Sequence, residues 1–189
     1  MKSIIKSEFK EHLKVSAIAM ESIIESIEKA AKLCIKSLEN GKKILIFGNG
    51  GSAADSQHIA AEIVGRYKVE RKGLPAIALT TDSSILTAIG NDFGYLHTFD
   101  RQVEALANKG DVLIGISTGG TSKNVVSAMK LANNIGCKSI GFSGKDPGDM
   151  GKICNIILNA PSNETPRIQE IHIILVHTLC HLIDQEHLV

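Results

Sequence analysis

Aromatic residues and long apolar runs are scarce in this chain. It has no Trp, two Tyr and five Phe among 189 residues, so its core must be aliphatic. No uninterrupted apolar run approaches the ~20 residues that a helix needs to cross a bilayer. The charged N-terminus also lacks the apolar centre of a signal peptide. We therefore expect a cytoplasmic protein without a membrane partner.

The sequence also lacks an excess of charge of one sign and any closely spaced cysteine pair. Its 21 basic and 20 acidic residues give a net charge of +1, and no basic run occurs. This balance argues against a nucleic-acid partner, because such proteins neutralise many phosphates. The cysteines are far apart and form no C-x-x-C motif, which favours buried, reduced thiols; they are Cys34, Cys137, Cys154 and Cys180.

Two hydrophobic patterns divide the chain at Gly41. Before it, apolar residues recur at helical spacing without Gly or Pro, which predicts one long helix or two abutting ones over residues 1–40. After it, short apolar runs typical of strands buried on both faces occupy residues 43–48, 76–79, 112–116, 139–142 and 153–158. Helical patterns follow at 52–66, 83–107 (broken near Gly90), 121–135 and 166–186.

Alternating strands and helices indicate βαβ units and a parallel sheet. At this length one compact domain is expected, and no linker or repeat interrupts the sequence. We therefore predict a single α/β domain over residues 1–189. Residues 1–40 form its N-terminal helical segment, and residues 41–189 form a five-stranded parallel sheet flanked by helices in a flavodoxin-like three-layer arrangement.

Two of the predicted strands end in turns rich in glycine and hydroxyl groups, at 48–52 and 117–122, and each turn leads into a helix. Glycine permits close approach of an anion to the backbone, and a helix start offers unpaired N–H groups. Each turn alone could be a capped connection only. In a doubly wound sheet, however, the loops after the first and third strands flank one ligand site. The absence of Gly-Lys-Ser/Thr, with Ala at position 53, favours a small phosphorylated metabolite over a nucleotide.

A second cluster of chemical groups follows the first turn. His58 and Glu62 are four residues apart and share a helix face, while the last predicted helix carries Gln169 and His177. Imidazole and carboxylate are suitable zinc ligands, although such a pair is more often an ordinary surface pair. Gln169 and His177 are separated by ~12 Å along their helix. They can bind one metal only by stretching toward a point between them, or if they come from different subunits.

Together these motifs resemble the sedoheptulose 7-phosphate isomerases (phosphoheptose isomerases), a family with the SIS, or sugar isomerase, fold. The resemblance covers nearly the whole chain and is carried by residues 48–62, 91–95, 117–122 and 167–170 with His177. It implies conversion of D-sedoheptulose 7-phosphate to D-glycero-D-manno-heptose 7-phosphate, the first step toward activated heptoses for lipopolysaccharide core or capsule. It also implies a cytoplasmic homotetramer with interfacial active sites and one Zn²⁺ per subunit.

The resemblance also implies residue roles. Glu62 and His177 would be the catalytic acid–base pair, acting through an enediolate. The zinc ligands would be His58, Glu62, Gln169 and His177. The substrate-binding residues would be Asn49, Gly50, Gly51, Ser52, His58, Glu62, Asn91, Asp92, Ser117, Thr118, Gly119, Ser122 and Gln169. The family usually has Ser-Thr-Ser-Gly-Asn-Ser at 117–122, so Gly119 removes a hydroxyl and Thr121 replaces an amide. A difference in substrate preference is expected there.

Two other functions remain open from the sequence. One is a non-catalytic tetrameric SIS protein that binds a replication-initiator partner, and the other is an isomerase for a hexose or pentose phosphate. The complete His/Glu/Gln/His set favours an enzyme over the binding protein. His97 and His172 are further candidates for function, whereas the remaining histidines are interpreted as surface or interface residues; they are His12, His181 and His187.

Overall fold

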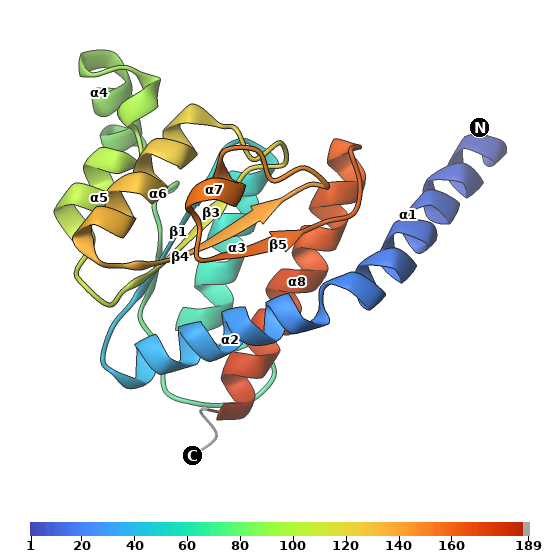
Figure 1. Cartoon of the computed structure of the whole chain (residues 1–189), viewed down its shortest axis with the longest axis horizontal. Helices are drawn as coiled ribbons and strands as arrows, with labels where there is room; N and C mark the ends of the chain where they lie inside the picture. Colours follow the sequence, from blue (N-terminus) through green and yellow to red (C-terminus); the bar gives the residue numbers. More distant parts are fainter. Residues whose placement is uncertain (187–189) are drawn as a thin grey trace.

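The computed structural model describes residues 1–186 and contains a five-stranded sheet in the order β2-β1-β3-β4-β5 (Figure 1). All neighbouring strands are parallel. The strands are β1 (Ile44–Gly48), β2 (Ala76–Ala78), β3 (Val112–Ile116), β4 (Lys138–Ser143) and β5 (Ile156–Asn159). The predicted start of the fifth strand at Ile153 was wrong, because Ile153 ends a short helix, α7 (Met150–Ile153), and the strand begins at Ile156.

Helices cover both faces of the sheet, as predicted. Alternate residues of β1 separate the two cores: Ile44 and Ile46 face one layer, and Leu45 and Phe47 face the other. The first layer consists of α1 (Lys2–Ser22), α2 (Ile24–Glu39), α3 (Gly51–Val64) and α8 (Thr165–Glu186). The second consists of α4 (Ser83–Asp92), η1 (Tyr95–His97), α5 (Asp100–Leu106), α6 (Lys123–Ile135) and α7. The predicted α/β class and its three layers are therefore confirmed.

The boundaries of several helices differ from the sequence prediction. The first forty residues form two abutting helices that meet at Ile23. The segment 83–107 does not break at Gly90, which lies inside α4. It breaks after Phe93, where Gly94 takes a φ of +87° that favours glycine, and again before Asp100. Residues 121 and 122 belong to the turn before α6, because Ser122 is the residue that precedes its first turn.

Helix α1 extends away from the body of the domain (Figure 1). It is attached to the start of α8 by Arg167, which donates to the backbone carbonyl of Glu8 at 2.6 Å and to its carboxylate at 2.9 Å. Glu170 accepts a further bond from Arg167 and lies 2.9 Å from His12. Several large apolar side chains of α1 are exposed, namely Ile4, Ile5, Phe9, Leu13, Ile18 and Met20.

Two expectations from composition can be compared directly with the fold. Among residues 1–186, no helix is both long enough and apolar enough to cross a membrane. All four cysteines are free thiols, and three of them, Cys34, Cys137 and Cys180, are buried. The core is aliphatic apart from a few Phe rings, of which Phe47, Phe99 and Phe142 are the largest fully buried side chains.

Candidate active site

The two glycine-rich turns lie side by side at the carboxyl edge of the sheet. They follow β1 and β3, which are adjacent, with Gly48 paired to Ile116 at the last position of the ladder. The next strands in sequence, β2 and β4, lie on opposite sides of this pair, so the turns are at a topological switch point. The predicted juxtaposition of residues 48–52 and 117–122 is therefore confirmed.

The first turn is held in place by a network around Asn49. Its side-chain amide exchanges two hydrogen bonds of 3.0 Å with the amide of Asn124, and its Oδ1 accepts the Tyr95 hydroxyl at 2.8 Å. Gly50 takes a φ of +57°, which glycine adopts without strain, and α3 starts immediately after it. Sequence analysis missed Asn124, because nothing in the local sequence distinguishes it from the other polar residues of α6.

The second turn presents a pair of hydroxyl groups. Ser117 and Ser122 lie 2.9 Å apart at their Oγ atoms. Gly120 has a φ of +64°, and a Cβ there would lie 2.0 Å from the Pro147 carbonyl, so only glycine fits. At Gly119 an added Cβ would be 3.6 Å from Thr121 Oγ1, an ordinary contact. The backbone therefore accommodates a side chain at 119, and this chain simply lacks one.

Asn91 and Asp92 lie at the end of α4, on the surface. Asn91 donates to Asp92 at 2.8 Å. Within the described residues, neither side chain forms a hydrogen bond with a candidate site residue other than its neighbour. Tyr95, three residues further on, is the member of this motif that reaches the first glycine turn through Asn49. The substrate-binding role of Asn91 and Asp92 stays a prediction.

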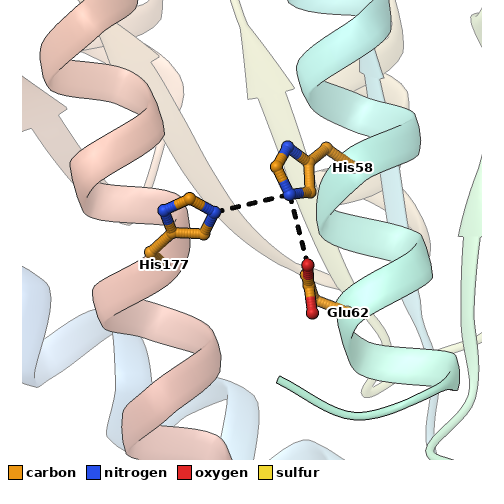
Figure 2. A group of neighbouring side chains, drawn as sticks. All are labelled: His58, Glu62 and His177. Carbon is orange, nitrogen blue, oxygen red and sulfur yellow. Dashed lines mark hydrogen bonds and ion pairs between the residues drawn. The ribbon is translucent and has the colours of Figure 1, made fainter. Parts of the chain in front are cut away.

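Three of the four proposed metal ligands converge between α3 and α8 (Figure 2). His58 Nε2 lies 3.2 Å from Glu62 Oε1 and 3.4 Å from His177 Nε2. One ligand atom from each residue lies within 4.8 Å of the others. Ligand atoms bound at ~2 Å in a tetrahedral site are roughly 3.3 Å apart. The donor set and its spacing therefore fit a divalent ion that prefers nitrogen and oxygen ligands.

Gln169 lies at the other end of the α3–α8 pair. A Cβ on Gly51 would be 2.5 Å from its Nε2, so the Gln169 amide covers the first turn of α3. His177, eight residues later, lies about two turns along at the level of His58. Gln169 is therefore beside the predicted phosphate turn, which supports its predicted role with substrate. Its role as a fourth metal ligand stays a prediction.

Asp55 occupies the same face of α3 between these two levels, one turn before His58. Burial raises the pKa of its carboxyl group, an effect that the nearby His58 partly offsets. Its Oδ2 is buried and has no hydrogen-bond partner within the described residues. Sequence analysis did not single out Asp55, although its i, i+3 spacing from His58 was visible.

Two other histidine candidates have local partners. His97 Nδ1 lies 3.0 Å from an oxygen of Asp100. His172 is fully buried, and its Nε2 donates to the Ser143 carbonyl at 3.0 Å, so it belongs to the core. His12 and His181 are half-buried, as expected for surface or interface residues, while His187 lies outside the described residues.

Because His172 is buried in its neutral form, we expect the protein to lose stability in mild acid. Burial lowers its pKa to about 4, although the hydrogen bond to Ser143 opposes this shift. The unfolded chain has a His pKa of ~6.5 and binds the proton first. The contribution of neutral His172 to the free energy of unfolding is therefore complete above pH ~6.5 and disappears as the pH falls toward ~4. Urea unfolding at several pH values should show a steeper decline for wild type than for His172→Gln, whereas His12→Gln should keep the wild-type slope. Equal slopes in all three proteins would contradict this prediction.

Comparisons with known proteins agree with this arrangement. The SIS domain family matches residues 9–144. A phosphoheptose isomerase of Aliarcobacter butzleri is 60% identical over 186 residues, covering 98% of both chains. The solved phosphoheptose isomerase of Neisseria gonorrhoeae is 44% identical with a TM-score of 0.92, covering 97% of this chain and 98% of the other. That of Francisella tularensis is 38% identical with a TM-score of 0.94, covering 97% of each. The chain therefore belongs to the phosphoheptose isomerase family of SIS-domain proteins.

Proposed function

We propose that this protein is an aldose–ketose isomerase that converts D-sedoheptulose 7-phosphate to D-glycero-D-manno-heptose 7-phosphate. The observation that carries the proposal is the convergence of His58 and Glu62 of α3 with His177 of α8, because α3 also begins at the first glycine turn. From Gly51 to His58 the helix rises ~10 Å. An extended seven-carbon sugar phosphate can span this separation, with its phosphate at the glycine turns and its reacting carbons at the cluster.

The phosphate group would be held by backbone and hydroxyl donors without a basic side chain. The first turns of α3 and α6 supply N–H groups and the positive ends of two helix dipoles. The Ser117 and Ser122 hydroxyls already point toward each other across the second turn. The residues proposed to bind substrate are Asn49, Gly50, Gly51, Ser52, His58, Glu62, Asn91, Asp92, Ser117, Thr118, Gly119, Ser122 and Gln169.

The chemistry requires one proton to move between adjacent carbons and another between their oxygens. Glu62 and His177 would exchange these protons through an enediolate, and their convergence between α3 and α8 supports this assignment. His58 would orient Glu62 through their 3.2 Å contact. A zinc ion held by His58, Glu62 and His177, with Gln169 as the proposed fourth ligand, would stabilise negative charge on the substrate oxygens.

We further propose a cytoplasmic homotetramer with one Zn²⁺ per subunit and active sites at its interfaces. The exposed apolar residues of α1 support an assembly, because a second chain would remove them from water. The product would enter activated-heptose synthesis for lipopolysaccharide core or capsule. The completeness of the site and the relatives at 50–60% identity favour catalysis over a non-catalytic role with a replication initiator.

Incubation with sedoheptulose 7-phosphate tests the proposed function. We expect the zinc-loaded protein to form the aldoheptose phosphate, a chelator to stop the reaction, and added zinc to restore it. Product analysis by NMR follows each step, and a hexose 6-phosphate and a pentose 5-phosphate serve as comparison substrates. Faster turnover of either comparison substrate would favour another sugar phosphate. No conversion of any of them by the zinc-loaded protein would favour the non-catalytic alternative.

A further inference from the structure

The segment between α3 and β2, residues 65–75, brings an aromatic ring onto the active-site cluster. The ring of Tyr67 is stacked on the imidazole of His177, with centroids 5.2 Å apart and an interplanar angle of 21°. It also lies 6.0 Å from the ring of His181, one turn further along α8. His58 approaches the same imidazole in an edge-on arrangement, at 5.0 Å and 76°. The His177 ring therefore contacts both Tyr67 and His58.

This segment is fixed to α8 by the buried carboxylate of Asp184. One oxygen accepts the backbone N–H groups of Tyr67, Lys68 and Val69 at 3.2, 2.8 and 3.1 Å. The other accepts Arg71 Nε at 2.7 Å. The side chains of Arg71 and Asp184 are 1% and 0% exposed, so the pair is shielded from water. The position of Tyr67 is thus set by its own backbone hydrogen bond and those of its two neighbours.

The same pair also reaches the helix that carries the other two cluster residues. Arg71 donates from Nη1 to the carbonyl of Ile63 at 3.0 Å and from Nη2 to the carbonyl of Glu62 at 3.1 Å. These carbonyls belong to the last turn of α3, whose orphan acceptors need donors from outside the helix. Asp184 lies seven residues after His177, on the same face of α8. One ion pair therefore links the last turn of α3, the 65–75 segment and α8.

The His177 ring needs such a support from packing. A histidine ring turns easily about its outer torsion, and histidines in metal sites are usually fixed by a hydrogen bond to the second ring nitrogen. In the part of the chain that the structure describes, Nδ1 of His177 has no hydrogen-bond partner, and Nε2 is the atom that faces His58. The stacked contact with Tyr67 restrains the plane of the imidazole, and in the observed orientation Nε2 faces His58.

We propose that Tyr67, held by the Asp184–Arg71 pair, is a positioning residue that orients His177 toward His58 and Glu62. This inference rests on the proposed function for its effect on turnover. The stacking face of the ring matters and the hydroxyl does not, because the contact with His177 is made ring to ring. We therefore expect phenylalanine at position 67 to keep the orientation of His177, and a non-planar side chain of similar size to lose it.

The test compares Tyr67→Leu with Tyr67→Phe. In Tyr67→Leu we expect zinc affinity, measured by chelator competition, to fall ~10–100-fold, the range found when the support of a ligating histidine is removed. We expect kcat with sedoheptulose 7-phosphate at saturating zinc to fall at least tenfold, with KM little changed because the phosphate turns are untouched. Tyr67→Phe should keep zinc affinity, kcat and KM close to wild type.

Leu74→Ala is the matched control, since Leu74 is a partly buried apolar residue of the same segment that packs on the same core as Tyr67 but has no ring to stack on His177. It should lower the melting temperature while leaving zinc affinity and kcat unchanged. The proposal is overturned if Tyr67→Leu binds zinc and turns over substrate like wild type, or if Leu74→Ala reproduces its losses. A wild-type protein that binds zinc without isomerising the sugar would overturn the proposed function alone, and a zinc-affinity loss confined to Tyr67→Leu would still support the positioning role.

Discussion

Replacing Glu62 with glutamine is expected to reduce kcat for sedoheptulose 7-phosphate by at least ~100-fold, the lower end of what a positioned acid or base contributes. Glutamine has nearly the same shape but cannot accept a proton from carbon. The fold should persist, because the backbone carbonyl of residue 62, and not its side chain, bonds to Arg71. The Glu62 side chain is 24% exposed and contacts His58 only at its carboxylate, so the substitution leaves the core unchanged.

The assay should be run at saturating zinc, with bound metal measured in parallel, so that a missing base is distinguished from a missing ligand. Glu70→Gln is a suitable control because it removes an exposed carboxylate from the neighbouring segment. That variant should retain wild-type kcat and KM. Near-normal turnover by Glu62→Gln, with an unchanged melting temperature, would exclude Glu62 from the acid–base pair.

The largest expected effect on stability comes from Asp184→Ala, at about 3–5 kcal/mol, the usual loss when one partner of a buried ion pair is removed. Arg71 would stay inside the protein without its counter-charge, and three backbone N–H groups would lose their acceptor. Burial by itself would raise the pKa of Asp184, but the N–H groups of Lys68 and Val69 together with Arg71 lower it overall, so the carboxylate is charged in the folded protein at neutral pH.

Urea denaturation at pH 7 measures this loss as a shift of the midpoint. Glu104→Ala provides the comparison, since it breaks the exposed pair with Arg101 and should lower stability by only a small fraction of that amount. If Asp184→Ala were no more destabilising than Glu104→Ala, the 65–75 segment would not be anchored as the structure indicates.

The regular parts of the fold were predictable because short-range patterns determine them. The strand at 112–116 was predicted at its true bounds, since an apolar run that ends in Ser-Thr-Gly-Gly has few alternatives. His58 and Glu62 were found together because helical spacing alone puts them on one face. Ile153 was misassigned because an apolar residue before Cys154 fits a helix end and a strand start equally well.

The support of the site was not predictable, since it depends on contacts far apart in sequence. Residues 65–75 show no hydrophobic periodicity. The role of Tyr67 becomes visible only in the fold, where α8 brings His177 against its ring. Asp184, in turn, is one of many polar residues in α8. Its partners lie more than 110 residues earlier, and nothing local to residue 184 indicates them.

Four residues along the continuous helix α8 contact different parts of the protein. Arg167 binds α1, Gln169 covers the first turn of α3, His177 joins the cluster, and Asp184 holds the 65–75 segment. Each residue added to or removed from α8 would rotate the helix residues that follow it by ~100° about the helix axis and shift them by ~1.5 Å along it. We therefore expect an insertion or deletion within α8 to separate these contacts, whereas the loops around the helix can change in length without altering its internal spacing.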